Sequence, residues 1–113
     1  MPEDSTSTDL LIDIAATGDR VDVAIRGELD AHSAVQFEHD ALDALAEHAG
    51  LRTMVLDLGG ITFIDSSGLR SLLRLQESCD ESGGVLFVRR PSDVVSRIID
   101  LAKLGTRFPV EPA

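Results

Sequence analysis

Three polar residues, Asp65, Ser66 and Ser67, stand directly before Gly68 where an apolar segment gives way to a helical pattern. Aspartate and serine are favoured at helix N-termini because their side chains accept hydrogen bonds from free backbone N–H groups. One helix needs only one such cap. A phosphate on Ser66 would meet the remaining N–H groups and the positive end of the helix dipole. The segment therefore predicts either plain capping or a phosphorylation switch.

Hydrolysis is the main enzymatic alternative for Ser66. A nucleophile elbow needs glycine two positions before and two positions after the serine. Gly68 meets this requirement and Ile64 does not. All three histidines precede the serine, which is not the order found in α/β-hydrolases. The pattern therefore disfavours a serine hydrolase.

A second acidic group, Asp30, follows the strand-like segment that ends near Gly27. Asp30, Asp57 and Asp65 would form a Mg²⁺ pocket if they met at one end of a sheet, where ligands of α/β domains commonly bind. A phospho-aspartate receiver of this kind also needs a lysine at a strand end. The single lysine, Lys103, is predicted to lie inside a helix. We therefore expect Asp57 to be structural and leave the role of Asp30 open.

The other reactive side chains have simple structural explanations. His32 and His39 are seven residues apart, whereas metal-binding histidines on a helix are more often three or four apart. Cys79 falls on an apolar helical stripe, which predicts a buried thiol. Arg70 and Arg74 belong to a charged face that either keeps the helix soluble or contacts a partner beside the serines.

The composition limits the classes of function. The 113 residues suffice for one domain, and 20 acidic against 10 basic residues give a net charge of −10. Such a surface repels nucleic-acid phosphates, and the chain has no Trp or Tyr and only four Phe for base stacking. The sequence lacks an apolar run long enough for a membrane span. One cysteine and an acidic N-terminus predict a cytoplasmic protein.

The hydrophobic pattern predicts an α/β domain with a mixed sheet over residues 10–113, after a flexible tail over 1–9. We expect a hairpin of strands 10–15 and 21–26, then strands 53–58 and 85–88 and a short final strand at Phe108 and Val110. A loop over 27–32 should precede a helix capped by Ser33 with Gln36 three residues later. A turn at 59–60 should lead to a short apolar piece over 61–64, and Arg89-Arg90 should lie in a surface loop. Further helices should span 66–81 and run from Asp93 to a stop at Gly105.

From about Leu10 to Leu104 the chain resembles the bacterial anti-sigma factor antagonists, the single-domain STAS family. The resemblance implies a STAS-like mixed sheet of four to five strands with three or more helices. The matching motifs are Gly27-Glu28-Leu29-Asp30, Val55-Leu56-Asp57-Leu58, Phe63-Ile64-Asp65-Ser66-Ser67-Gly68-Leu69, Gly83-Gly84, Pro91 and Ile98-Ile99-Asp100-Leu101.

This resemblance implies a regulatory cycle rather than an enzyme. Ser66 would be the phosphoacceptor of an anti-sigma factor serine kinase with a histidine-kinase-like ATPase fold. The unphosphorylated chain would bind that kinase and release the sigma factor, and a metal-dependent serine phosphatase would restore this form. The ATP would belong to the partner, so the chain itself would need no cofactor and no metal. The expected partner-binding residues are Asp30, Asp65, Ser66, Ser67, Gly68, Arg70 and Arg74.

A second reading keeps the STAS fold without a switch. In it the chain is a scaffold subunit of a signalling assembly or a lipid-transport accessory module, and Ser66 undergoes no turnover.

Overall fold

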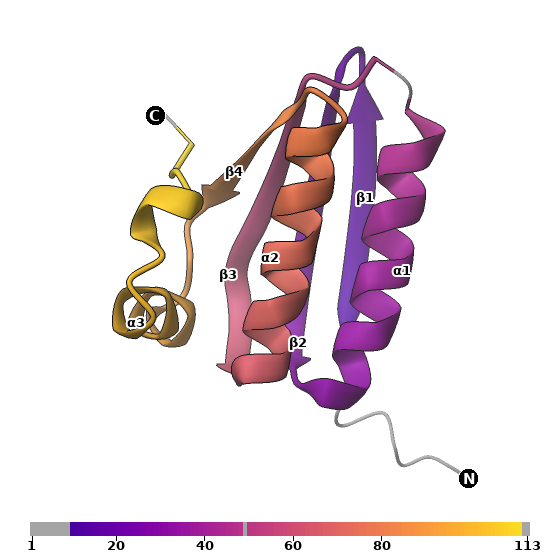
Figure 1. The fold of residues 1–113 in the computed structure, drawn as a ribbon. Coiled ribbons are helices and arrows are strands. Elements are labelled where there is room, and N and C mark those ends of the chain that lie inside the picture. The colour runs from indigo at the N-terminus through magenta and orange to yellow at the C-terminus, as the bar shows by residue number, and fades with distance from the viewer. Residues whose placement is uncertain (1–9, 49, 112–113) are drawn as a thin grey trace, which may run out of the picture.

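The computed structural model describes residues 10–48 and 50–111 and contains a four-stranded sheet in the order β1-β2-β3-β4 (Figure 1). β1 is antiparallel to β2, whereas β2, β3 and β4 are parallel to one another. This confirms the predicted α/β fold with a mixed sheet; the predicted tail over 1–9 lies outside the described residues. The elements are β1 (Leu11–Thr17), β2 (Arg20–Leu29), α1 (Ala31–Glu47), β3 (Thr53–Ile64), α2 (Ser66–Glu81), β4 (Val85–Arg89), α3 (Asp93–Leu101) and the 3₁₀ helix η2 (Gly105–Arg107).

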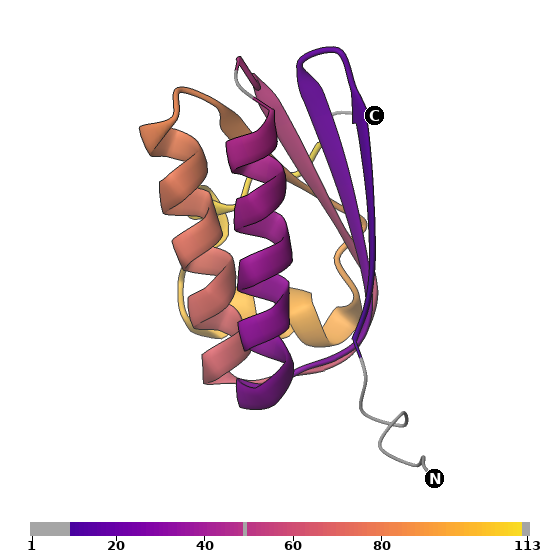
Figure 2. The ribbon, with the colours of Figure 1, turned by 90° about the vertical axis from the view of Figure 1, so that its right-hand side faces the viewer.

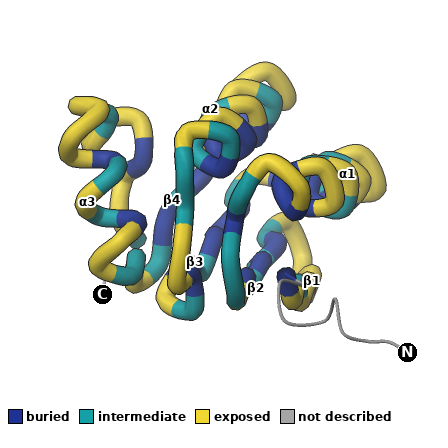
Figure 3. Tube along the Cα trace, turned by 90° about the horizontal axis from the view of Figure 1, so that it is seen from below, coloured by how far each residue is buried: buried dark blue, intermediate teal, exposed yellow. Residues whose placement is uncertain are grey.

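Two helices form a layer over one face of the sheet. α1 and α2 run side by side on this face (Figure 2), with α1 packed over β2 and α2 over β3 and β4. Their buried residues face the strands (Figure 3). The buried residues of both helices fill the core, which removes apolar surface from water and stabilises the fold. Fully buried side chains at its centre include Val23, Ile25, Phe37, Leu56 and Leu72.

α3 occupies a different place, beside β3 (Figure 1). β4 pairs with β3 only from Thr53 to Asp57. Beyond that point the chain leaves β4, and the backbone N–H of Ser92 donates to the Leu58 carbonyl at 3.2 Å. α3 therefore lies along the half of β3 that β4 does not pair.

β3 is one continuous strand, so the turn predicted at Gly59-Gly60 was wrong. Neither glycine has a positive φ. The Arg26 side chain of β2 lies over Gly60, where a Cβ would overlap it, and a Cβ on Gly59 would lie 3.0 Å from the Arg90 carbonyl oxygen. The two glycines therefore make room for neighbouring groups within an extended strand.

The region between β2 and α1 also differs from the prediction of a loop over 27–32. β2 continues to Leu29 through register shifts at Ala24/Arg26 and Gly27/Glu28, and Gly27 has a φ of 116°. α1 starts at Ala31 with Asp30 as its N-cap, so Ser33 is not the cap. A bulge with a glycine at positive φ keeps the strand paired where the sequence alone suggests a break.

The third helix ends earlier than predicted. Its last residue is Leu101, and the residue with positive φ after it is Lys103, at 59°, rather than Gly105. Lys103 therefore lies outside the helix, and Gly105 starts η2. The predicted final strand is reduced to a single parallel bridge between Val110 and Val88, while Phe108 is buried.

The sheet face opposite α1 and α2 carries an ion-pair network. Glu111 accepts from Arg89 Nε and from Arg20 Nη2, each at 2.7 Å, and Arg20 Nε donates to Asp22 at 3.0 Å. Val55 alternates with inward-facing residues and points to this side, yet it is only 1% exposed. Arg89 is the last residue of β4 and so does not lie in a surface loop, whereas Arg90 follows the strand and is exposed as predicted. The network ties the C-terminal end of the described chain to the sheet.

Candidate functional site

The first turn of α2 presents the predicted serines. Asp65 is the N-cap, and its side chain accepts a hydrogen bond from the Gly68 backbone N–H at 3.0 Å. Ser66 is the first helical residue and is exposed, whereas Ser67 is half-buried. Within the part of the chain that the structure describes, neither serine hydroxyl forms a hydrogen bond with another side chain. Asp65 thus performs the capping, and Ser66 remains free at the positive end of the helix dipole.

Gly68 is buried at the contact between α2 and the end of β2. A Cβ at this position would overlap the Leu29 carbonyl oxygen and lie 2.9 Å from Ile64 Cγ1. The group that approaches its backbone is therefore the protein's own strand. This close contact fixes where the first turn of α2, and with it Ser66, projects from the sheet.

Asp30 follows the end of β2 and lies at the same end of the sheet as Asp65, which follows the end of β3. Leu29 and Ile64 are register partners in the parallel pair β2–β3, and the two aspartates are the residues that follow them. Asp30 is the N-cap of α1 and accepts from the backbone N–H groups of His32 at 3.0 Å and Ser33 at 2.9 Å. The backbone N–H of Ser33 is the main group that lowers the pKa of Asp30 below its ordinary value.

The capping box at α1 pairs Asp30 with Ser33, not Ser33 with Gln36 as predicted. The backbone N–H of Asp30 donates to Ser33 Oγ at 3.0 Å, and Ser33 Oγ donates to the Glu28 carbonyl at 2.6 Å. The box has the same reciprocal form that the sequence suggested, displaced by three residues. Asp30 is consequently held in place as a charged group beside the start of α2.

A shallow groove between α1 and α2 begins at Ser67. Arg74 Nη1 spans it to Glu38 of α1 at 3.3 Å, whereas Arg70 is exposed and forms no ion pair with another described residue. On the α1 side of the groove, Val35 is an apolar residue that is 71% exposed. The groove is lined by Ala31, Ala34, Val35, Glu38, Ser67, Arg70 and Arg74.

The predicted partner-binding residues lie on one surface, which we call the α2 docking surface, except Gly68, which is buried against Leu29 and is not accessible to a partner. Val35 and Glu38 were not identified from the sequence. The signal was present in Val35, an apolar residue that lies off the apolar stripe formed by Phe37 and Ala41. The α2 docking surface comprises Asp30, Val35, Glu38, Asp65, Ser66, Ser67, Arg70 and Arg74.

Asp57 does not join the other two aspartates. It lies in the middle of β3, opposite Ala24 and Arg89, so the three carboxylates do not form a pocket. Its Oδ2 accepts from Arg90 at 2.6 Å, and its Oδ1 accepts from the Gly59 N–H at 3.0 Å. Burial raises the pKa of Asp57, but these hydrogen bonds outweigh that effect and hold it below the ordinary value. Asp57 is structural, as expected.

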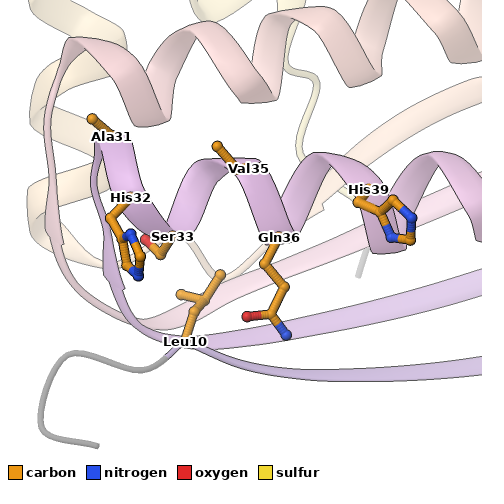
Figure 4. Close-up of a pocket in the computed structure, with 7 residues that line it drawn as sticks. All are labelled: Leu10, Ala31, His32, Ser33, Val35, Gln36 and His39. Atoms are coloured by element: carbon orange, nitrogen blue, oxygen red, sulfur yellow. The ribbon is translucent and has the colours of Figure 1, made fainter. Parts of the chain in front are cut away.

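His32 and His39 lie on the surface of α1, whereas Cys79 is buried. His32 and His39 line an open depression along α1 that also includes Leu10 and Gln36 (Figure 4). Both are exposed, and His39 Nδ1 lies 3.4 Å from Asp40 Oδ1. The described residues contain no cluster of side chains that could hold a metal ion. Cys79 is buried as predicted, and burial raises the pKa of its thiol.

A comparison with protein families decides the identity of the fold. The family model described as "Mlab, STAS domain" matches residues 12–110, which covers every strand and helix except the first residue of β1. The chain belongs to the STAS domain family. The predicted resemblance is therefore confirmed at the level of the family. No helix in residues 10–48 and 50–111 of this STAS domain is long and apolar enough to cross a bilayer.

Individual relatives of this STAS domain include proteins named as anti-sigma factor antagonists. An "Anti-sigma F factor antagonist" of Paenibacillus polymyxa is 28% identical over 88 residues, which cover 78% of this chain and 74% of the relative. An anti-sigma factor antagonist structure from Mycobacterium paratuberculosis superposes with a TM-score of 0.79 at 24% identity, over 92% of this chain and 86% of that one.

The phosphorylated form of SpoIIAA, a cell-fate determinant of Bacillus, also shares the fold. Its TM-score is 0.70 at 20% identity, and the match covers 90% of this chain and 92% of SpoIIAA. At these identities the two structures establish the common fold. They do not by themselves transfer a function to this STAS domain.

Proposed function

We propose that this STAS domain is an anti-sigma factor antagonist controlled by phosphorylation of Ser66. Its unphosphorylated form binds an anti-sigma factor serine kinase, which then releases the sigma factor. The observation that carries the proposal is the exposed Ser66 at the first position of α2, beside the α2 docking surface. The family membership and the named relatives support it.

The position of Ser66 suits a phosphoacceptor. Asp65 already caps the helix through Gly68, so a phosphate on Ser66 removes no existing contact of the fold. The new group would stand at the positive end of the α2 dipole near backbone N–H groups, where anions are stabilised. The domain therefore accommodates the modification without a large rearrangement.

The same position makes phosphorylation an effective switch. A phosphate adds about −1.5 to −2 charges at neutral pH. Ser66 borders the α2 docking surface, where the exposed Val35 offers apolar contact and Arg70 offers an unpaired charge among the described residues. A partner that covers this surface would have to bury the new charge. Coupling of about 1–3 kcal/mol is enough to change the affinity by a factor of roughly 5–150.

The remaining partners follow from this cycle. The kinase holds the ATP, so the STAS domain acts as a protein substrate and binding module, without a cofactor and without catalysis of its own. A metal-dependent serine phosphatase removes the phosphate from Ser66 and restores the binding form. The cycle takes place in the cytoplasm, and it requires no direct contact with nucleic acid or membrane.

The alternative is a STAS domain without turnover at Ser66. It would serve as a scaffold subunit of a signalling assembly or as an accessory module of lipid transport. The description of the matching family model, "Mlab, STAS domain", is not specific to antagonists of anti-sigma factors, so this alternative is included in the test.

The test is intact-mass measurement after incubation with ATP and each candidate anti-sigma kinase of the same cell, followed by fragmentation to locate the phosphate. We expect one added phosphate on Ser66 and none on the Ser66→Ala variant. An established kinase–substrate pair serves as the positive control. Absence of phosphate with every candidate, while the control is modified, would overturn the switch and favour the scaffold or transport role.

A further inference from the structure

β1 is an open edge of the sheet. Every residue of β1 except Ile12 is exposed, and no other described segment pairs with its free side. Its sequence, Leu-Ile-Asp-Ile-Ala-Ala-Thr, carries a single charge at Asp13 and contains no proline and no lysine. Its pairing with β2 is regular over all seven residues, without a bulge. Apart from the charge of Asp13, the features that normally keep an edge strand from pairing are therefore absent from β1.

The opposite edge of the sheet is covered near the end of β4. The backbone N–H of Val88 in β4 donates to the Pro109 carbonyl, and the N–H of Glu111 donates to the Val88 carbonyl, each at 2.8 Å. The Arg89 side chain adds its bond to Glu111 at 2.7 Å. The C-terminal segment thus occupies the last residues of the β4 edge, at Val88 and Arg89. No described segment occupies any part of the β1 edge, so β1 is the more open edge for another strand.

We propose that β1 pairs with β1 of a second copy of this chain. Antiparallel pairing about a twofold axis joins the two four-stranded sheets into one continuous sheet. The strand sequence selects the register. If the twofold axis passes between the two copies of Ile14, all seven residues of each β1 have a partner, and Asp13 lies opposite Ala15 of the second copy. Centring on Asp13 would place two carboxylates opposite each other, and centring on Ala15 would leave Leu11 and Ile12 without strand partners.

This register also buries apolar surface that the monomer leaves open. Ile14 is the β1 partner of Val23, so it lies on the sheet face that α1 and α2 cover. It is nevertheless 41% exposed, because α1 packs over β2 and not over the edge. Across the twofold axis Ile14 meets Ile14 of the second copy, and Ile12 meets Ala16. Cross-strand pairs of this kind are the unit of stabilisation in a sheet.

The proposed register has one unfavourable contact, and this contact predicts how association depends on salt. Asp13 and Asp13 of the second copy lie diagonally on one face, about 7–8 Å apart, where like charges repel. Association is therefore weak at low salt and increases with salt or with Asp13→Asn. The α2 docking surface stays accessible, since its groove lies between α1 and α2 and includes no residue of β1. The proposal is independent of the phosphorylation switch.

Sedimentation equilibrium of the full chain over a concentration series up to about 1 mM tests the pairing. We expect the mass to rise from 12.1 kDa toward twice that value. Ile14→Lys should remain at the monomer mass, because it places two like charges on the axis. Val85→Lys is the matched control: Val85 is 47% exposed at the start of the other edge strand, and its substitution should leave association unchanged.

A cysteine variant tests the register itself. Directly opposed residues of antiparallel strands have Cα atoms about 4.5–5.5 Å apart, within the range of a disulfide. Ile14→Cys should form a disulfide-linked dimer with oxidised glutathione, while Val85→Cys should not; the natural Cys79 is buried. A wild-type chain that stays monomeric throughout the series would overturn the proposal. Equal cross-linking of the two cysteine variants would overturn it as well.

Discussion

Asp30 and Asp65 cap two different helices from adjacent positions at one end of the sheet, where β2 and β3 stop. Each aspartate directly follows a member of the register pair Leu29–Ile64, and each accepts a backbone N–H three residues ahead. The starts of α1 and α2 are therefore set side by side by the pairing of β2 with β3. This arrangement explains how a loop acid distant in sequence comes to stand beside the serine that we propose as the phosphoacceptor.

Substitutions of Ser66 should separate the two states of the switch. Ser66→Ala cannot carry a phosphate, so it should bind the cognate kinase persistently in the presence of ATP. Ser66→Asp places a negative charge at the docking surface and should bind more weakly, by a factor of roughly 5–150. Calorimetric titration with the kinase measures both affinities. Equal affinity of the two variants would contradict the proposed switch.

Ser67 provides the matched control within the same turn. It is half-buried at the groove between α1 and α2, whereas Ser66 is exposed. Ser67→Ala should therefore still receive one phosphate from the kinase, at a site that fragmentation places on Ser66. If Ser67→Ala loses the phosphate and Ser66→Ala keeps it, the phosphoacceptor lies one residue further along the helix.

Gly68→Ala should destabilise the domain although alanine favours helices. Alanine gains about 1 kcal/mol of helix propensity over glycine. The new Cβ would overlap the Leu29 carbonyl oxygen, and such overpacking costs about 1–3 kcal/mol. We expect a lower free energy of unfolding in urea. The control is Gly105→Ala, where no heavy atom lies within 4 Å of the added Cβ; a loss of equal size there would rule out the packing explanation.

The Glu111 network should make stability depend on pH in acid. Hydrogen bonds from Arg89, and next from Arg20, lower the pKa of Glu111 from 4.5 to about 2. A group with a lowered folded-state pKa stabilises the fold above its unfolded pKa, and this contribution is lost as it becomes protonated. Wild type should therefore be more stable than Glu111→Gln at neutral pH, and the difference should disappear between pH 4.5 and about 2.

Urea unfolding at a series of pH values measures this difference. Glu81→Gln is the control, because Glu81 is exposed and forms no ion pair with another described residue. The difference between wild type and Glu81→Gln should stay small throughout. A difference for Glu111→Gln that does not change across the acid range would contradict the proposed role of the network.

Local pattern was sufficient for most elements of the fold. The hydrophobic pattern predicted a strand over 21–26, where Val21, Val23 and Ile25 are the buried residues of β2. α2 begins at Ser66 and ends at Glu81 as predicted. Asp65, Ser66 and Gly68 marked the candidate site because a strand end, a cap and a serine run coincide in a few residues. These properties depend on neighbouring residues alone, so they are visible in the sequence.

Errors arose where distant segments decide the conformation. Gly59 and Gly60 remain in β3 because Arg26 and the Arg90 backbone need their space, and Lys103 rather than Gly105 takes the left-handed position after α3. Gly27 stays within β2 because β3 pairs with it. A glycine in the sequence permits both a turn and a close contact, and only the neighbouring element selects between them.

The sequence by itself determined which residues are able to cap, to accept a phosphate and to form the core, since these properties belong to residue type and local spacing. Tertiary structure alone decided which of them stand together. The β2–β3 register placed Asp30 next to Asp65 and left Asp57 seven residues before the end of β3. It also placed Val35 and Glu38 across a groove from Ser67 and Arg74. Such proximities depend on strand pairing and helix packing between segments that are remote along the chain.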